Sequence, residues 1–203
     1  MSFRRDFITK PILSWARGVL PTMSDTEREA LEAGDVWWDA DLFTGNPDWA
    51  KLLAVAPATM TPEEQAFLNG PVDQLCGMLD DWKINWEWRD LPPEVWAYIK
   101  REKFFGMIIP KEYGGLGFSP YAHSEVVRKL SSRSLTAAVT VMVPNSLGPG
   151  ELLMRFGTRE QQQRWLPRLA DGREIPCFGL TSPEAGSDAA SMIDTGVICK
   201  GTF

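Results

Sequence analysis

The sequence predicts an α+β chain in which an all-α N-terminal part precedes the start of a β domain. Up to about residue 172, apolar residues recur at helical spacing between Ser, Thr and Pro residues that are typical of helix starts. Beyond that point the pattern changes to short apolar runs at 176–181 and 193–199, with a turn-rich loop between them. Such runs are typical of strands, so the β part is expected to begin near residue 173.

Capping residues predict where the helices begin. In Thr61-Pro62-Glu63-Glu64, the Thr is a suitable cap, the Pro suits the first helical position and the second Glu suits the third. Similar pairs or Pro-led starts occur at Ser24, Pro92-Pro93, Ser119-Pro120 and Thr158. Helices are therefore expected over 24–33, 61–81, 93–106, 120–128 and 158–171.

Three further stretches have a distinct composition. Residues 35–57 are rich in Trp, Asp, Gly and Pro and are expected to be irregular, whereas Leu135 to Val143 is almost wholly apolar and is expected to be buried. Trp82, Trp86 and Trp88 could form a stripe for a partner or a ligand. Aromatic residues at such spacing more often belong to the core, which is the interpretation we favour.

Composition excludes several classes of function. The chain has 203 residues, of which 44% are apolar and 24% charged, as in ordinary globular proteins. Its net charge of −6 argues against nucleic acid as a partner. The three cysteines form no CxxC pair, which favours a reducing cytoplasm over a disulfide framework. His123 is the only histidine, so no metal site is expected.

The first twenty residues are basic and carry many apolar side chains, but they do not form a convincing signal peptide. No apolar run approaches the length of a membrane span. Two interpretations stay open. Residues 1–20 could lie on the inner membrane as a peripheral contact, or they could be an arm that docks on the rest of the protein, which is the one we favour.

The segment 177–188 carries the most chemical information. Pro183 stiffens the exit from a predicted strand, and the small residues Ala185, Gly186 and Ser187 allow a flat or phosphorylated ligand to approach the backbone. Successive exposed amides there could form an anion-binding nest. The segment lacks GxGxxG and the GKS or GKT of a P-loop. By composition alone, an ordinary strand-to-loop turn is the better interpretation.

The order of residues in this segment changes that interpretation. Leu180-Thr181-Ser182-Pro183-Glu184-Ala185-Gly186-Ser187-Asp188 resembles the first signature of the acyl-CoA dehydrogenase family, except that Ser182 stands where the common pattern has Glu. Two upstream blocks resemble the same family in the same order, namely its lead-in helix at 156–172 and its glycine-rich loop at 110–117. The resemblance covers about residues 90–203.

The resemblance implies a division of the chain. Residues 91–172 are similar to the helical N-terminal domain of the family, and residues 173–203 are similar to the start of its middle β domain. The Trp-rich extension at 1–90, expected to be mostly helical, is similar to that of the large FadE-type bacterial enzymes. The chain is thus identified as a truncated N-terminal part of an acyl-CoA dehydrogenase-like fold.

The resemblance also implies a function. Members use FAD to introduce an α,β double bond into fatty acyl-CoA in β-oxidation, pass the electrons to an electron-transfer flavoprotein and form homo-oligomers. Positions that match the flavin-binding residues of the family are Phe178, Leu180, Thr181, Gly186 and Ser187. Ser187 is also expected near the acyl-CoA, and 135–143 is expected to wall the acyl pocket.

The catalytic base of the family lies in a later helical domain, so it is expected beyond residue 203. The chain alone is therefore expected to be inactive, poorly soluble and weak for FAD. Two alternatives remain: an acyl-CoA oxidase, in which oxygen accepts the electrons, and a non-enzymatic helical module or decayed gene product.

Overall fold

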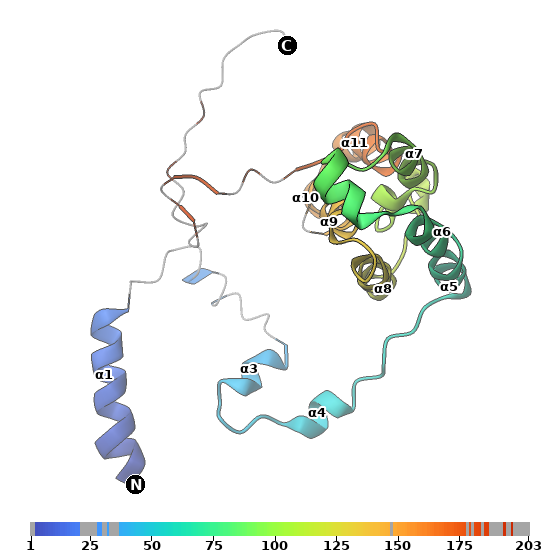
Figure 1. The fold of residues 1–203 in the computed structure, drawn as a ribbon. Helices are drawn as coiled ribbons and strands as arrows, with labels where there is room; N and C mark the ends of the chain where they lie inside the picture. Colours follow the sequence, from blue (N-terminus) through green and yellow to red (C-terminus); the bar gives the residue numbers. More distant parts are fainter. Residues whose placement is uncertain are drawn as a thin grey trace. The chain divides into compact units, whose positions relative to one another are not determined.

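The computed structural model describes residues 3–20, 28–29, 32, 37–146, 148–177, 179, 181–183, 185–186, 193 and 196. The chain divides into two compact units, one formed by residues 57–179 and the other by residues 1–56 together with 180–203. Within the described ranges the regular structure is helical (Figure 1). The predicted all-α N-terminal part is therefore confirmed.

The unit 57–179 is a bundle of short helices joined by tight turns, seen in green to orange in Figure 1. Its α-helices are α5 (Pro62–Asn69), α6 (Pro71–Met78), α7 (Pro93–Arg101), α8 (Pro120–Ser131), α9 (Leu135–Asn145), α10 (Pro149–Phe156) and α11 (Arg159–Ala170). Between them lie a π-helical segment, Lys83–Trp88, and two 3₁₀ turns, Phe104–Gly106 and Lys111–Tyr113.

The predicted helix starts in this unit are confirmed at the atomic level. The Glu64 N–H donates to Thr61 Oγ1 at 3.2 Å, and Glu64 Oε2 accepts from the Thr61 N–H at 2.7 Å, which completes a capping box at α5. Thr158 forms a second capping box at α11. Ser119 caps α8 by accepting from the Ala122 N–H at 3.2 Å.

Two predicted helices are shorter than expected. The helix over 61–81 is interrupted at Gly70, because Pro71 lacks an N–H and its ring would collide with the preceding turn. It therefore becomes α5 and α6. The α7 helix ends at Arg101 rather than at 106, because Lys103 takes a left-handed φ of 61° that no α-helix tolerates.

The core of this unit forms around α8, which packs against α5, α6 and α9. The Phe67 ring lies 4.9 Å from that of Phe104 and 5.1 Å from that of Phe118. Residues from 67 to 84 are part of the same buried cluster as residues from 91 to 141. The boundary predicted at residue 90 therefore runs through a continuous core, since residues 57–90 fold together with the helical domain.

The tryptophans of the π-helical segment are not core, contrary to our interpretation. Trp82, Trp86 and Trp88 are 66%, 61% and 47% exposed. Arg89 lies over the Trp86 ring and Lys83 over the Trp88 ring, so each of these two indoles has a cationic neighbour at the surface. The buried residue of this segment is Ile84.

The other unit contains short helices among its described residues: a π-helical turn at Arg5–Thr9, then α1 (Lys10–Val19), α3 (Asp39–Leu42) and α4 (Trp49–Leu53). The expectation that 35–57 is irregular is therefore wrong in part. Asp48 caps α4 by accepting from two backbone N–H groups, and the Trp38 indole donates to the Asp48 carbonyl at 2.7 Å. These local contacts stabilise α3 and α4, although the apolar residues of this stretch do not recur at helical spacing.

Several predicted elements fall largely on residues that the structure does not describe. The predicted helix 24–33 and the predicted strand 193–199 lie mostly outside the described residues. Of the predicted strand 176–181, the four described residues Pro176, Cys177, Gly179 and Thr181 are not in a strand. Within the described residues, no helix is long and apolar enough to cross a bilayer.

Candidate functional site

The glycine-rich loop at 113–117 folds back on the turn that precedes it. Gly114 and Gly117 take φ values of 86° and 63°, which favour glycine. A side chain at Gly115 would collide with the carbonyl oxygens of Gly106 and Ile109. The Leu116 N–H donates to the Gly106 carbonyl at 2.9 Å, which ties the loop down. The loop therefore fixes residues 106–109 and, through them, one wall of a cavity.

Asn145, the last residue of α9, fixes the opposite wall of this cavity relative to residues 104–108. Its side chain is buried, and Nδ2 donates to the carbonyls of Phe104 and Val141 at 2.6 and 2.9 Å. Oδ1 accepts from the Ile108 N–H at 3.2 Å. One amide thus satisfies three backbone groups, because buried polar groups are costly when unpaired. Asn145 was missed from the sequence, where only its place at the end of an apolar run could have drawn attention.

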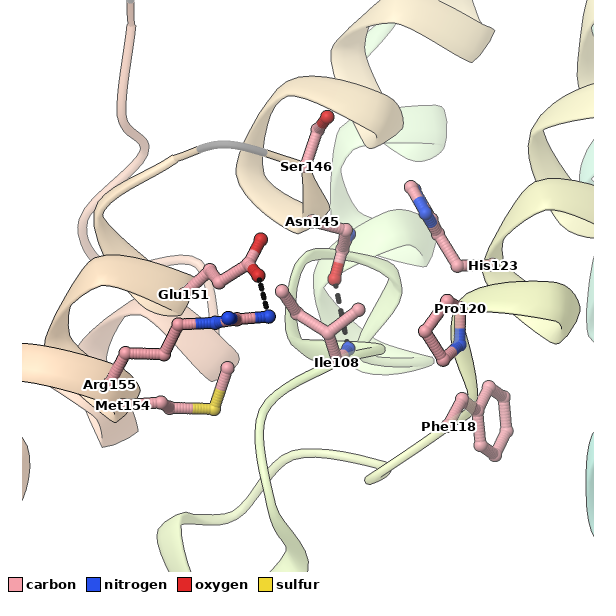
Figure 2. A pocket seen from close by; sticks show the side chains of 9 residues that line it. All are labelled: Ile108, Phe118, Pro120, His123, Asn145, Ser146, Glu151, Met154 and Arg155. Atoms are coloured by element: carbon pink, nitrogen blue, oxygen red, sulfur yellow. Dashed lines mark hydrogen bonds and ion pairs between the residues drawn. The ribbon is translucent and has the colours of Figure 1, made fainter. Parts of the chain in front are cut away.

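These walls line an open cavity of about 400 Å³ (Figure 2). It is lined from four places in the chain: the turn before the glycine-rich loop, the start of α8, the end of α9 and the helix α10. The lining residues are Ile108, Phe118, Pro120, His123, Asn145, Ser146, Glu151, Met154 and Arg155. In Figure 2, Ile108 lies between the pair formed by Glu151 and Arg155 on one side and His123 on the other.

The lining of this cavity contains one ion pair and one buried imidazole. Glu151 forms an ion pair with Arg155 at 2.8 Å. Burial lowers the pKa of His123, which keeps its imidazole neutral at pH 7. The His123 Nε2 is buried and finds no hydrogen-bond partner among the described residues. Those residues also contain no cluster of His, Cys, Asp and Glu able to hold a metal ion.

The helix α9 carries apolar side chains that are exposed. The prediction that the whole of Leu135 to Val143 is buried is therefore wrong. Ala137, Ala138 and Val141 are buried against the core, but Leu135 and Val139 are 67% and 43% exposed. Met142 and Val143 are half-buried. Among the described residues of its unit, α9 packs against α8, α10 and the turn at 104–106, and Leu135 and Val139 lie outside these contacts.

The predicted flavin-binding residues are only partly described. Phe178, Leu180 and Ser187 lie outside the described residues, whereas Thr181 and Gly186 are described and exposed. Between the latter two, Ser182 and Ala185 are joined by two hydrogen bonds. The Ala185 N–H donates to Ser182 Oγ, and the Ser182 N–H donates to the Ala185 carbonyl, both at 3.2 Å. Ser182, the residue that departs from the family pattern, thus contacts Ala185 through both its side chain and its backbone.

Comparison with known proteins decides the family. The family described as "Acyl-CoA dehydrogenase, N-terminal domain" matches residues 61–173, which is more than half of the chain. The chain belongs to the acyl-CoA dehydrogenase family. The match includes α5 to α11, the glycine-rich loop and every residue that lines the cavity. It begins well before residue 90, in agreement with the continuous core described above.

Curated relatives of this acyl-CoA dehydrogenase family member include a human and a mycobacterial protein. The human very long-chain specific acyl-CoA dehydrogenase, which is mitochondrial, is 30% identical over 144 residues, or 70% of this chain and 22% of that protein. Acyl-CoA dehydrogenase fadE12 of Mycobacterium tuberculosis is 35% identical over 102 residues, or 50% of this chain and 26% of that protein. The chain thus spans about a quarter of each relative or less.

Solved structures support the same fold. A chain in the structural work on the electron-transferring flavoprotein of Acidaminococcus fermentans superposes with a TM-score of 0.58 at 25% identity, over 67% of this chain and 36% of that one. Butyryl-CoA dehydrogenase from Megasphaera elsdenii superposes with a TM-score of 0.55 at 22% identity, over 66% and 36%. The second likeness is one of fold alone.

Proposed function

We propose that this chain is the helical N-terminal part of an FAD-dependent dehydrogenase that introduces an α,β double bond into fatty acyl-CoA during β-oxidation. The observation that carries the proposal is the family match over residues 61–173. It is supported by α9, whose exposed apolar face is suited to an alkyl chain. The proposed setting is a reducing cytoplasm, as expected from three cysteines without a CxxC pair.

In this proposal, the face of α9 formed by Leu135, Val139, Met142 and Val143 walls the acyl pocket. These residues lie at intervals of four, three and one along the helix, so they share one side of it. Apolar side chains there would exclude water from the acyl chain. The buried Asn145 and the glycine-rich loop would act indirectly, by holding the end of α9 against residues 104–108.

We infer that residues 178–187 hold the flavin, with Phe178, Leu180, Thr181, Gly186 and Ser187 in contact with it and Ser187 also near the acyl-CoA. The described part fits such a group. Thr181 is exposed, and the space beside Gly186 is open, so a flat ligand can approach the backbone of Gly186. Bound FAD would supply the hydride acceptor for the reaction.

We propose, from the resemblance to the family, that the base that removes the α-proton lies beyond residue 203, whereas Glu151, the carboxylate in the cavity, is paired with Arg155. The chain alone is therefore expected to be inactive and weak for FAD, with poor solubility. Activity is expected from the complete protein, as a homo-oligomer with an electron-transfer flavoprotein as acceptor. A stoichiometric flavin spectrum from soluble residues 1–203 would contradict the expectation for the isolated chain.

The function is tested on the protein encoded by the complete reading frame that contains these residues. Under anaerobic conditions, saturated acyl-CoA substrates of increasing chain length are added and the flavin absorbance is followed. Bleaching by acyl-CoA supports the proposal. A protein that binds FAD but is bleached by no acyl-CoA would contradict it, and a complete protein without FAD would favour the non-enzymatic helical module.

Two variants sharpen this experiment. Val139→Trp fills space beside the exposed face of α9 and is expected to reduce the longest acyl chain that causes bleaching, whereas Leu152→Trp, at an exposed apolar position of α10, is the matched control. Oxygen uptake during turnover separates the acyl-CoA oxidase from the dehydrogenase. Rapid reoxidation by oxygen, with release of hydrogen peroxide, would favour the oxidase.

A further inference from the structure

The N-terminal helical segment has an apolar stripe that is exposed among the described residues of its own unit. Ile8, Ile12, Trp15 and Val19 are separated by four, three and four residues, so they lie along one side of the helix. All four are at least half exposed, and no residue of Arg5–Thr9 or of α1 is buried. The stacked rings of Phe3 and Phe7, 4.8 Å apart, extend the apolar surface at one end.

The side opposite this stripe carries two basic residues next to the exposed Leu13 and Leu20. Lys10 and Arg17 are seven residues apart and therefore share the face that lies away from Ile12 and Val19. Residues 3–20 carry four basic side chains and one acidic one, Asp6, which is paired with Lys10 at 2.7 Å. The chain as a whole carries −6, so the segment is a local reversal of its charge.

From this geometry we propose that residues 3–20 lie in the interface of an anionic lipid bilayer. The Ile8, Ile12, Trp15 and Val19 stripe enters the boundary of the acyl chains, and the basic side chains meet the headgroup phosphates. An amphipathic helix with basic residues on one face and Trp and aliphatic residues on the other is suited to this position. The indole of Trp15 is suited to the same depth, since it is apolar with one polar atom.

Charge complementarity favours a bilayer over a groove on a protein. Arg4 and Arg5, four and three residues before Ile8, lie beside the stripe, so an anionic bilayer that takes up the stripe also meets their charges, whereas an apolar groove would not. The long stems of these side chains let their charges reach the headgroups while the helix lies flat. Because the rest of the chain is acidic, the same charge pattern would keep that part away from the surface.

Flotation of the complete protein with vesicles tests this proposal. Vesicles contain phosphatidylcholine alone or with about one-third phosphatidylglycerol, a mixture that supplies anionic headgroups. Wild-type protein is expected to float with the anionic vesicles and to float less as salt is raised, because screening weakens the basic contacts. Ile12→Asp is expected to reduce the bound fraction about tenfold or more, since it puts a charge into the apolar stripe.

Matched variants separate the two faces and the alternative occupants. Lys10→Glu with Arg17→Glu is expected to abolish the preference for anionic vesicles, whereas Leu53→Asp, at an 82% exposed apolar position of α4, is expected to leave flotation unchanged. Equal flotation of wild type and Ile12→Asp would overturn the proposal. A lower thermal midpoint for Ile12→Asp would also overturn it, because the stripe would then pack on the protein itself. A loss of oligomers in this variant would overturn it as well, because the stripe would then pack on a second copy of the chain. Flavin bleaching by acyl-CoA is measured in parallel, so failure here is distinct from failure of the proposed enzymatic function.

Discussion

Helices α8 and α1 have the same kind of sequence pattern and different surroundings. Both are amphipathic, begin with Pro in the first turn and carry basic residues in the last turn. In α8 the apolar positions Ala122, Val126 and Leu130, at intervals of four, are buried in the core of the unit 57–179. In α1 the corresponding stripe is exposed along its whole length. A pattern of this kind predicts that a helix has an apolar partner, but it does not identify that partner.

The helix α9 lies between these two cases. One side of it packs on α8 and belongs to the core, and the other side, with Leu135 and Val139, is exposed. We therefore assign a different partner to each of these three apolar surfaces: the protein core to α8, an acyl chain to the exposed side of α9 and a lipid bilayer to α1. Substitutions on each surface should have effects that differ in size and in kind.

The largest difference is expected between Val126→Asp and Ile12→Asp. Val126 is fully buried, so an aspartate there places an unpaired charge in the core and should cost about 4 kcal/mol or more of unfolding free energy. Ile12 is 58% exposed, and the same change should alter the stability by less than about 0.5 kcal/mol. Urea unfolding of both variants of the complete protein checks this. Similar losses in the two would break the comparison.

A smaller but substantial loss is expected from Asn145→Ala. The change leaves the Ile108 N–H and the Phe104 and Val141 carbonyls without their side-chain partner, and it opens a small cavity. The expected cost is about 2–4 kcal/mol of unfolding free energy. Asn145→Asp, which keeps the shape and loses the two donors, is the matched variant. Stability within about 0.5 kcal/mol of wild type for the alanine variant would show that Asn145 does not tie α9 to the turn at 104–108.

A smaller loss of stability is expected at Glu64, whose side chain accepts hydrogen bonds at the starts of both α5 and α8. Burial alone would raise the pKa of Glu64, but the N–H groups of Ser119 and Thr61 outweigh it and lower the pKa from 4.5 to about 2. A lowered pKa stabilises the fold above the unfolded value, and this stabilisation is lost as pH falls from about 4.5 towards 2. Glu64→Gln should therefore lose about 1–3 kcal/mol at pH 7.

The difference between wild type and Glu64→Gln should then narrow as the pH is lowered through that window. Urea midpoints at pH 7, 5, 4 and 3 follow this convergence. A gap that stays constant over the whole range would mean that the ionised carboxylate contributes no more than a neutral amide of the same shape.

The smallest effect is expected at the start of α11. Thr158→Ala removes one half of the capping box with Gln161, which should cost about 1 kcal/mol of unfolding free energy. Thr158→Ser keeps the hydroxyl and should restore most of the loss. Because α11 packs against the turn at 104–106, the loss should appear in the same cooperative transition as that of Asn145→Ala. A separate early transition would show that α11 unfolds independently.

Local chemistry was predictable from the sequence, and long-range contacts were not. The caps at Thr61, Ser119 and Thr158 depend on residues within one helical turn, and the structure confirms them. No local pattern indicates that Glu64 also reaches the Ser119 N–H, 55 residues away. The exposure of the tryptophans at 82, 86 and 88 was likewise unpredictable, since it depends on Ile84 filling the core position of that segment.

For the candidate site, the three sequence blocks that resemble the family were enough to predict the family of the chain, because their order and composition are specific. The cavity was not predicted, since its lining comes from four separate places between Ile108 and Arg155. The expected burial of Leu135 to Val143 was too broad, because an almost wholly apolar helix can pack on protein on one side and on another apolar partner on the other. Sequence periodicity does not distinguish those two partners.

The most direct test of the central claim is to ask what touches the exposed face of α9 in the complete protein. A fatty acyl-CoA that carries a photoreactive diazirine on its alkyl chain is bound and irradiated, and the labelled residues are mapped by mass spectrometry. We predict labels on the α9 peptide, at Leu135, Val139, Met142 or Val143, that saturated unlabelled acyl-CoA suppresses. Labelling that is confined to other helices, or labelling of α9 that acyl-CoA does not compete, would contradict the claim that this face walls the acyl pocket.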